Sequence, residues 1–389
     1  MTKRLLLAAT AGAAAFLAAC SGSSTQFVAA PTTAGVNTFT FCSSSSNPTA
    51  GTTSCPTAAP ATTDDVGGGF WNSVDVYYPA ATVTRAVIFL HGAGGYNYGI
   101  AYDLGLNSQD APAQTANINF DWLTANSIIA VFPQGRGDLS SGGTWSNRVM
   151  TSGQDDLSMV QALASYVKTT YGVSNVYLVG HSNGGMMANR VWCEAGSPNP
   201  FAGYVALAGS PSEYYLANAC SPADIKPYSG IVGDSDTVIC DNGNATDYGI
   251  ENPVSGCDGS ASWTSPTWTI NSTYESGVDA SAFVDPTLIN EAVAQNSRAQ
   301  TLCGESLASS PTSTTGNNAI WTNCSGKLKL QEVIGANHPL SSGHGLLCAT
   351  GGNNDGNQCS IQTVSTGDGP GSTGLLDEWI MPFINSLGG

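Results

Sequence analysis

From about position 70 onward, hydrophobic residues follow two alternating patterns. Short continuous apolar runs at 86–90 and 127–132 are typical of strands buried on both faces. Residues 155–171 place apolar side chains at 157, 160, 163 and 167, the spacing of one helix face. Further strands are predicted at 74–78, 176–179, 204–208, 228–232 and 328–333, and further helices from 183 and at 375–387. This alternation predicts an α/β fold, with a mostly parallel, doubly wound sheet and helices on both faces.

Two segments break the alternation. Residues 20–69 are rich in Ser, Thr, Pro and Ala and carry almost no charge, so we predict a tether before a catalytic domain at 70–389. Residues 240–286 are rich in Gly, Ser, Asn and Asp. A loop of this length inside a compact domain predicts a lid-like insertion, pinned by a disulfide.

The first residues have the pattern of an export signal. Lys3 and Arg4 precede an apolar run at 5–17, which is short for a membrane span. The sequence LAAC at 17–20 resembles the lipobox of bacterial lipoproteins, which implies a signal peptide at 1–19 and lipidation of Cys20. We therefore expect export to the outer membrane or cell surface, with the lipid as the only membrane contact. The alternative is an ordinary secretion signal and full secretion.

The cysteines support an oxidising compartment. Apart from Cys20, ten of the 11 cysteines remain, an even number that is expected to pair. Pairing of nearest neighbours predicts the bridges Cys42–Cys55, Cys193–Cys220, Cys240–Cys257, Cys303–Cys324 and Cys348–Cys359. The sequence contains no C-x-x-C motif and only four histidines, so we predict no metal site.

The sharpest chemical signal is the segment NVYLVGHSNGGMMANRV at 175–191. Its GHSNG fits G-x-S-x-G and stands between an apolar strand pattern and a helical pattern, which is the setting of a nucleophile elbow. A turn of this kind exposes the Ser182 hydroxyl at the edge of the sheet, and the helix N-terminus favours negative charge beside it. We predict Ser182 as nucleophile; the alternative is a glycine-rich turn with an idle serine.

A second glycine-rich loop, HGAGG at 91–95, follows the predicted strand 86–90. Backbone N–H groups from such a loop and from the residue after the nucleophile form an oxyanion hole. We assign these donors to Ala93 and Asn183, with Gly94 as the alternative to Ala93. His91 precedes the nucleophile in the chain, so we expect it to be a hydrogen-bonded structural residue.

A serine hydroxyl needs a base, and the base needs an orienting acid. His338 lies in a loop after the strand 328–333, and His344 in the same loop is the alternative. Asp234 and Asp236 follow the strand 228–232, and either carboxylate suits the order Ser, Asp, His; we choose Asp236. The predicted triad is therefore Ser182, Asp236 and His338.

A set of motifs makes the chain resemble a known family. HGAGG, VFPQG, GTWSN, DDLSMVQALASYV, GHSNGGMMANRVWCE, GDSDTVI and GANHP resemble the polyhydroxybutyrate depolymerase and feruloyl esterase group of α/β-hydrolases, over about residues 85–385. The resemblance implies the α/β-hydrolase fold and the same triad, and it places the loop of Trp145 near the acyl pocket. The chain departs from the family in Pro339-Leu340 after the histidine and in the long 240–286 insert, both of which border that pocket.

Charge narrows the substrate. The 11 Lys and Arg against 28 Asp and Glu give a net charge of −17, which argues against a nucleic-acid partner. We expect two-step hydrolysis of neutral esters, polyesters or their oligomers without a cofactor, in a pocket to which Trp145 and Tyr96 contribute. The alternatives are an esterase for feruloyl or acetyl-xylan esters, a peptidase on the same fold, and a non-catalytic binding lipoprotein.

Overall fold

A computed structural model provides the structure of the protein. It describes residues 33–42, 71–136, 142–147, 152, 154–209, 211, 215, 220, 222–233, 286–315, 318–333, 336–340, 347–349 and 373–388. Only the backbone is described for both strands at 336–349 and for several residues of other strands and helices. The signal peptide, Cys20 and most of the 240–286 insert lie outside these residues.

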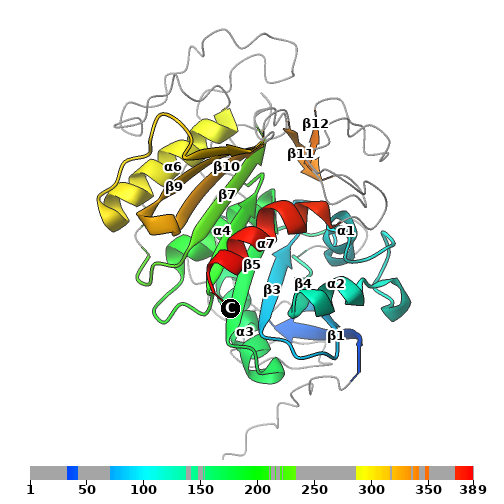
Figure 1. Ribbon diagram of the computed structural model, residues 1–389. Helices are drawn as coiled ribbons and strands as arrows, with labels where there is room; N and C mark the ends of the chain where they lie inside the picture. The colour runs from blue at the N-terminus through cyan, green and yellow to red at the C-terminus, as the bar shows by residue number, and fades with distance from the viewer. Residues whose placement is uncertain are drawn as a thin grey trace, which may run out of the picture.

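A ten-stranded sheet forms the centre of the protein (Figure 1). Its order is β1-β2-β4-β3-β5-β6-β7-β10-β9-β8, and the run from β4 to β10 is parallel. The strands are β1 (Gly35–Cys42), β2 (Trp71–Tyr78), β3 (Arg85–Leu90), β4 (Ile128–Pro133), β5 (Asn175–His181), β6 (Gly203–Leu207), β7 (Tyr228–Gly233), β8 (Ser313–Thr315), β9 (Asn318–Asn323) and β10 (Leu328–Val333). A separate hairpin joins β11 (Ala336–Leu340) and β12 (Leu347–Ala349).

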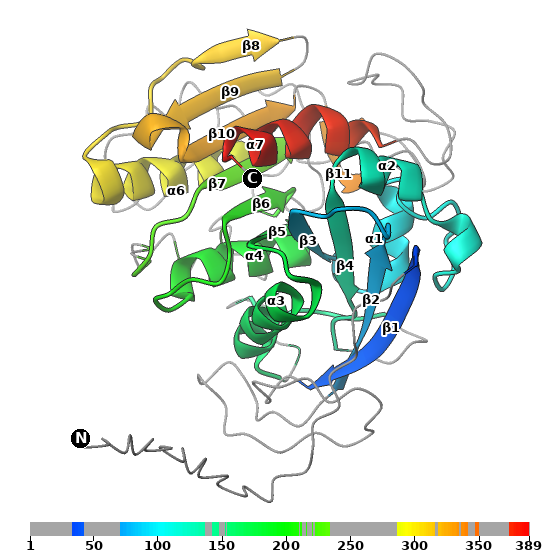
Figure 2. The same cartoon turned by 60° about the horizontal axis from the view of Figure 1, so that its bottom comes forward.

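Helices cover both faces of the sheet (Figure 2). They are α1 (Asn97–Asp103), α2 (Phe120–Ala125), α3 (Asp156–Tyr171), α4 (Asn183–Glu194), α6 (Pro286–Cys303) and α7 (Met381–Ser386), with short helices η1 (Thr115–Asn117), η3 (Cys324–Gly326) and η4 (Leu376–Ile380). Along β5, Val176 and Leu178 pack with α3 and α4, whereas Tyr177 and Val179 pack with α1, α2 and α7. Both faces are therefore apolar, which explains the continuous hydrophobic run of this strand.

The strand order confirms the predicted fold, an α/β-hydrolase fold with a mostly parallel, doubly wound sheet. β3 lies between β4 and β5, so the chain leaves β3 toward one side of the sheet and leaves β5 toward the other. Ligands of such sheets bind at the carboxyl ends of the strands where the winding direction changes. This switch point lies where β3 and β5 end side by side, because Leu90 pairs with Gly180.

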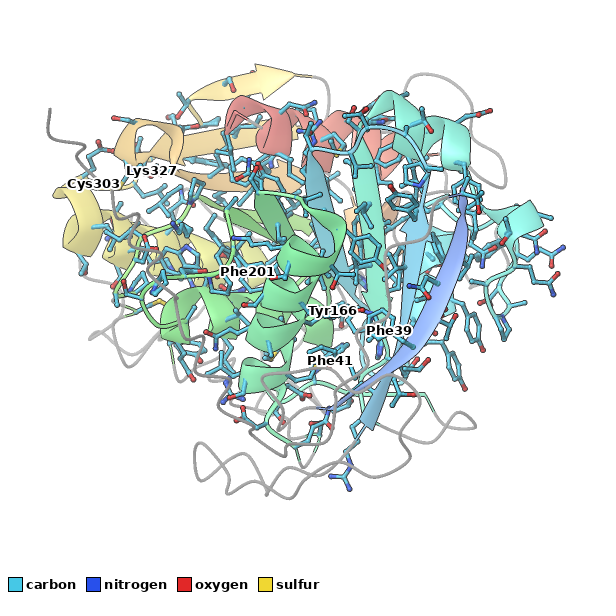
Figure 3. The ribbon with its side chains drawn as sticks, turned by 90° about the horizontal axis from the view of Figure 1, so that it is seen from below. Phe39, Phe41, Tyr166, Phe201, Cys303 and Lys327 are labelled. Atoms are coloured by element: carbon cyan, nitrogen blue, oxygen red, sulfur yellow. A yellow bond between two sulfur atoms is a disulfide. The ribbon has the colours of Figure 1, made fainter. Side chains whose placement is uncertain are left out.

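The domain begins earlier than predicted. Residues 35–42, assigned to the tether, form β1, which pairs antiparallel along the whole of β2. Phe39 and Phe41 alternate with polar threonines and pack against Tyr166 of α3, with ring centroids 5.2 and 6.0 Å apart (Figure 3). The boundary at residue 70 was therefore wrong, because the low charge of the long segment concealed a short amphipathic strand.

Among the helices of the described residues, none has the length and apolar character needed to cross a membrane. Two of the predicted disulfides are confirmed. Cys193–Cys220 joins the last turn of α4 to the segment before β7, and Cys303–Cys324 joins the end of α6 to η3. The predicted bridges Cys42–Cys55, Cys240–Cys257 and Cys348–Cys359 involve side chains outside the described part of the chain.

Candidate active site

Ser182 stands at the abrupt corner between β5 and α4, where the sequence placed the nucleophile. Its φ of 53° and ψ of −122° form a strained combination for a residue with a Cβ. The backbone N–H of Ser182 donates to the Leu207 carbonyl at the end of β6, at 2.9 Å. The neighbouring strand therefore holds the strained turn in place.

Glycines allow the corner to be so tight. A Cβ on Gly180 would lie 2.0 Å from the Gly184 carbonyl oxygen, and one on Gly184 would lie 2.4 Å from that of Leu90. Both contacts involve backbone atoms, so a side chain would have to displace the end of β3 or the start of α4. The G-x-S-x-G pattern is thus a steric requirement of this turn.

The loop at 91–95, which we call the oxyanion loop after its predicted role, lies directly beside the serine. A Cβ on Gly92 would lie 3.2 Å from the Cβ of Ser182. In the same loop the Gly94 N–H donates to the Gly143 carbonyl at 2.8 Å. This bond occupies the alternative oxyanion donor and favours Ala93, whose assignment stays a prediction.

His91 is the structural residue that the sequence suggested. Its ring is buried, and Nε2 accepts from the Gly135 N–H at 2.8 Å. Nδ1 then carries the proton and donates to the Gly92 carbonyl at 2.7 Å. Burial lowers the pKa of His91 to about 4, so the imidazole is neutral at pH 7. Its function is to fix the shape of the loop.

A short segment, residues 142–147, connects this loop to the elbow, and we call it the bridging strip. At one end, Gly94 donates to Gly143, which donates to the Gly95 carbonyl at 2.9 Å. Further along, the Asn183 side chain pairs with the backbone of Trp145: Oδ1 accepts its N–H at 2.7 Å and Nδ2 donates to its carbonyl at 3.0 Å. One strip therefore contacts both predicted halves of the oxyanion hole.

Trp145 has a different position from the one its predicted role requires. Its side chain is fully buried, and the indole N–H donates to the His91 carbonyl at 3.0 Å. This position assigns it a supporting role beneath the oxyanion loop. Tyr96 is half-buried at the start of α1, and its ring stacks on Tyr98 with centroids 5.0 Å apart. The aromatic pair thus follows the oxyanion loop in the chain.

A buried carboxylate that the sequence did not single out for chemistry lies behind the bridging strip. Asp156, the first residue of α3, accepts at Oδ2 from the Ser146 N–H at 2.7 Å and from the Ser152 hydroxyl at 2.6 Å. Its Oδ1 accepts from the Gln154 amide at 2.6 Å. From α4, the buried Arg190 donates to the Ser146 carbonyl at 2.8 Å. Burial raises the pKa of Asp156 to about 6, although these hydrogen bonds and Arg190 oppose the shift.

A second buried polar cluster supports the other side of α4. Arg298 of α6 donates to Oδ1 of Asn189 at 2.8 Å, and Nδ2 of Asn189 donates to the Gly209 carbonyl at 2.8 Å. Gly209 packs on the first turn of α4, because a Cβ there would lie 2.5 Å from the Cα of Gly185. Burial raises the pKa of Glu291, whose carboxylate accepts from the Tyr228 hydroxyl, to about 7.

The predicted acid and base are only partly within the described chain. Asp236 and the alternatives Asp234 and His344 lie outside it. For His338 the backbone is described: it belongs to β11, which lies against β7. β5, β6, β7 and β10 run parallel, so Ser182 and the chain after β7 and β10 lie at the same edge of the sheet. The order of strand ends is thus compatible with the predicted triad.

One group of metal-binding residue types occurs in the described part of the chain: Cys303, Glu305 and Cys324. The two sulfur atoms form the disulfide, and the Glu305 carboxylate accepts from the Cys324 N–H at 2.7 Å. These side chains already have partners within the protein, so the group is a structural junction between α6 and η3.

Comparisons with known proteins agree with this geometry. The model of the prolyl oligopeptidase family matches residues 114–216, which include the elbow, α3 and α4. A strained serine elbow beside a glycine-rich loop, within such a match, is the arrangement of a serine hydrolase on the α/β-hydrolase fold. A comparison with curated proteins found no match.

Several solved structures are similar to parts of the chain. The esterase Pf2001 of Pyrococcus furiosus is 17% identical, with 50% of this chain and 76% of that one covered and a TM-score of 0.31. XC6422 of Xanthomonas campestris, an α/β serine hydrolase without a lid, is 18% identical, with 52% and 80% covered and a TM-score of 0.31. S-formylglutathione hydrolase of Agrobacterium tumefaciens is 14% identical, with 47% and 80% covered and a TM-score of 0.31.

Proposed function

We propose that this protein is an exported, lipid-anchored serine carboxylesterase that hydrolyses neutral polyesters or their oligomers. Ser182 attacks the ester carbonyl while His338, oriented by Asp236, accepts its proton. The N–H groups of Ala93 and Asn183 stabilise the oxyanion, and the alcohol leaves with the proton from the imidazolium. Water then attacks the acyl carbon and gives a proton to His338, and the imidazolium returns this proton to the Ser182 oxygen as the acid leaves.

The observation that carries the chemistry is the strained backbone of Ser182 beside the oxyanion loop. Strain of this kind persists only where surrounding contacts impose it, and here Leu207 and the two glycines do so. A merely structural turn would be better served by glycine at position 182. A serine in this conformation, at the turn between β5 and α4 and beside the glycine-rich loop, therefore supports a nucleophile.

Two observations support a neutral, apolar substrate. Tyr96 and Tyr98 form a partly exposed stacked pair directly after the oxyanion loop, with ring planes 10° apart. Their faces suit the acyl or aryl part of an ester. The net charge of −17 also disfavours anionic polymers. Export and lipid anchoring are supported by the lipobox-like sequence that ends at Cys20.

Two other hydrolase activities need testing alongside. The match to the prolyl oligopeptidase family favours a peptidase as the second candidate. The motif resemblance to feruloyl esterases favours esters of plant polysaccharides as the nearest other ester substrates. A binding protein that retains the fold without turnover is the remaining alternative.

The decisive assay compares the full-chain protein with its Ser182→Ala variant on four substrates. These are p-nitrophenyl butyrate, a polyhydroxybutyrate suspension, a feruloylated arabinose ester and a prolyl p-nitroanilide. We expect turnover of the first two, lost by more than about a thousandfold in the variant. Preference for the anilide would indicate a peptidase, preference for the feruloyl ester would identify the other esterase, and no turnover at all would indicate a binding protein.

A further inference from the structure

Asp156 is a buried carboxylate for which the proposed Ser-His-Asp chemistry has no use. Helix capping does not explain it, because the preceding residue, Asp155, is the N-cap of α3 and accepts from the Ser158 N–H at 3.0 Å. Desolvation makes a buried carboxylate costly unless its hydrogen bonds offset the cost. The partners of Asp156 therefore indicate what it does.

Those partners belong to the bridging strip and to the segment that follows it. Oδ2 receives the Ser146 N–H, and Arg190 holds the carbonyl of the same residue from the side of α4. The backbone N–H and the backbone carbonyl of Ser146 are thus both held by buried, charged side chains. Any displacement of Ser146 would break one of these charge-assisted hydrogen bonds.

The residue before Ser146 transmits this constraint. The N–H and carbonyl of Trp145 are both paired with the Asn183 side chain, and Asn183 is also the residue whose N–H we assign to the oxyanion. At its other end, the strip is bonded to Gly94 and Gly95, directly after Ala93. The position of the strip therefore sets the distance between the oxyanion loop and the elbow.

We propose that Asp156 is a positioning residue, which holds the bridging strip so that the N–H groups of Ala93 and Asn183 point at one oxygen atom. The inference rests on the proposed serine-esterase mechanism. Oxyanion donors act only within about 2.7–3.1 Å of the oxyanion, and removing one such donor costs about 100- to 1000-fold in kcat. If the strip shifted by a fraction of an ångström, stabilisation of the transition state would therefore decrease more than the affinity for the substrate.

The test is steady-state hydrolysis of p-nitrophenyl butyrate by the full-chain protein, measured well below each variant's Tm. We expect Asp156→Ala to lower kcat by about 30- to 100-fold while KM changes less than about twofold. The affinity for a butylboronic acid, which forms a tetrahedral adduct with the serine, should fall by the same factor as kcat. If Asp156 only stabilised the fold, its removal would lower Tm without lowering kcat and the boronic acid affinity by the same factor.

Two further variants make the result specific. Asp156→Asn should recover most of kcat, because its oxygen can still accept from Ser146 and its Nδ2 can donate to Oε1 of Gln154, a buried oxygen with no partner among the described residues. The matched control is Asp155→Ala, which removes the N-cap of the same helix. It should lower Tm by a few degrees and leave kcat unchanged.

The outcomes separate this inference from the proposed function. If the wild-type protein hydrolyses no ester, the proposed function fails before any variant is compared. If the wild type is active and folded Asp156→Ala keeps kcat within twofold, or if Asp155→Ala loses as much, the inference is overturned. Should Asp156→Ala not fold, Ser152→Ala removes one bond to the same carboxylate oxygen; a several-fold loss of kcat supports the inference, and an unchanged kcat overturns it.

Discussion

Ser182 adopts φ and ψ values that cost a residue with a Cβ about 1–3 kcal/mol. Two contacts offset this cost: the hydrogen bond to Leu207 at the end of β6, and the close approach of Gly184 to the end of β3. The position proposed for the nucleophile therefore depends on backbone packing as much as on the serine side chain itself.

Gly184→Ala tests the packing at this scale. Alanine normally favours a helix over glycine, but here its Cβ would lie 2.4 Å from the Leu90 carbonyl oxygen and 2.5 Å from that of His91. We expect the free energy of unfolding to fall by about 3 kcal/mol, or soluble protein to be lost. The control is Gly196→Ala, where a Cβ would meet nothing within 4 Å. Equal stability of the two variants in urea titrations would contradict the steric account.

His91 provides the pH prediction. Its pKa falls from 6.5 to about 4 on folding, so between pH 6.5 and pH 4 His91 is protonated in the unfolded chain and neutral in the folded protein. His91 thus costs stability progressively as the pH falls from about 6.5 toward 4, by about 3 kcal/mol in total. Buried Asp156 and Glu291 have raised pKa values and act with the opposite sign, so the histidine has to be isolated by a variant.

The comparison is therefore between the wild type and His91→Gln at pH 7 and pH 4.5, with stability measured by denaturant unfolding. Relative to the wild type, the variant should gain about 2–3 kcal/mol on going to the lower pH, because glutamine does not titrate. A difference between the two proteins that is the same at both pH values would show that folding does not lower the pKa of His91.

Two residues show what local sequence can and cannot predict at the residue scale. The tight turn at Ser182 was predictable, because a corner of this kind requires glycines at fixed offsets around one residue. Asp156 was not, since two aspartates before a helix read equally well as a cap and a favourable dipole contact. Only the fold reveals that Asp155 caps the helix while Asp156 turns inward to Ser146.

At the scale of elements, strands with uniform burial were the easiest to predict. β4 is buried along its whole length, β3 and β5 are buried except at terminal residues, and all three were found to within two residues of their ends. Helix α6 was missed because its buried face is polar: Glu291, Gln295 and Arg298 are all almost fully buried there. Apolar periodicity does not reveal a helix whose buried side chains include hydrogen-bonded polar groups and an arginine packed on aromatic rings.

The missed strand β1 gives a prediction at this scale. Phe41 is fully buried between the sheet and α3, so β1 is part of the catalytic domain. Phe41→Ala should lower the free energy of unfolding by about 3–4 kcal/mol. Thr40→Ala on the opposite face of the strand is the control, and its effect should stay below about 1 kcal/mol. Matching thermal unfolding curves for wild type and Phe41→Ala would return the segment to the tether.

At the scale of the whole molecule, the parallel run from β4 to β10 explains why residues far apart in sequence were predicted to meet. Each parallel strand returns the chain to the same edge of the sheet. Ser182 follows the end of β5 at this edge, and β11 follows the end of β10; the segment after β7 begins at the same edge. Chain order was enough to predict this edge. The side-chain positions of Asp236 and His338 could not be predicted in this way, because strand order determines only where the chain leaves the sheet.

Net charge gives a prediction for the whole molecule. With a net charge of −17, the protein should repel an anionic substrate at low ionic strength and leave a neutral one unaffected. Raising NaCl from 10 to 300 mM should increase kcat/KM several-fold for a p-nitrophenyl hemisuccinate ester. The same change should alter kcat/KM for p-nitrophenyl butyrate by less than about 1.5-fold. An equal response of the two esters would mean that the charge lies away from the entrance to the site.

The proposed mechanism requires Ser182 to be the reactive nucleophile. The most direct measurement is the site of modification by a fluorophosphonate, located by mass spectrometry of the digested protein and compared with the activity that remains. We predict one phosphonyl group per chain on Ser182, with ester turnover lost in proportion to labelling. Turnover that is lost while Ser182 stays unmodified, with the label on another residue, would contradict the account.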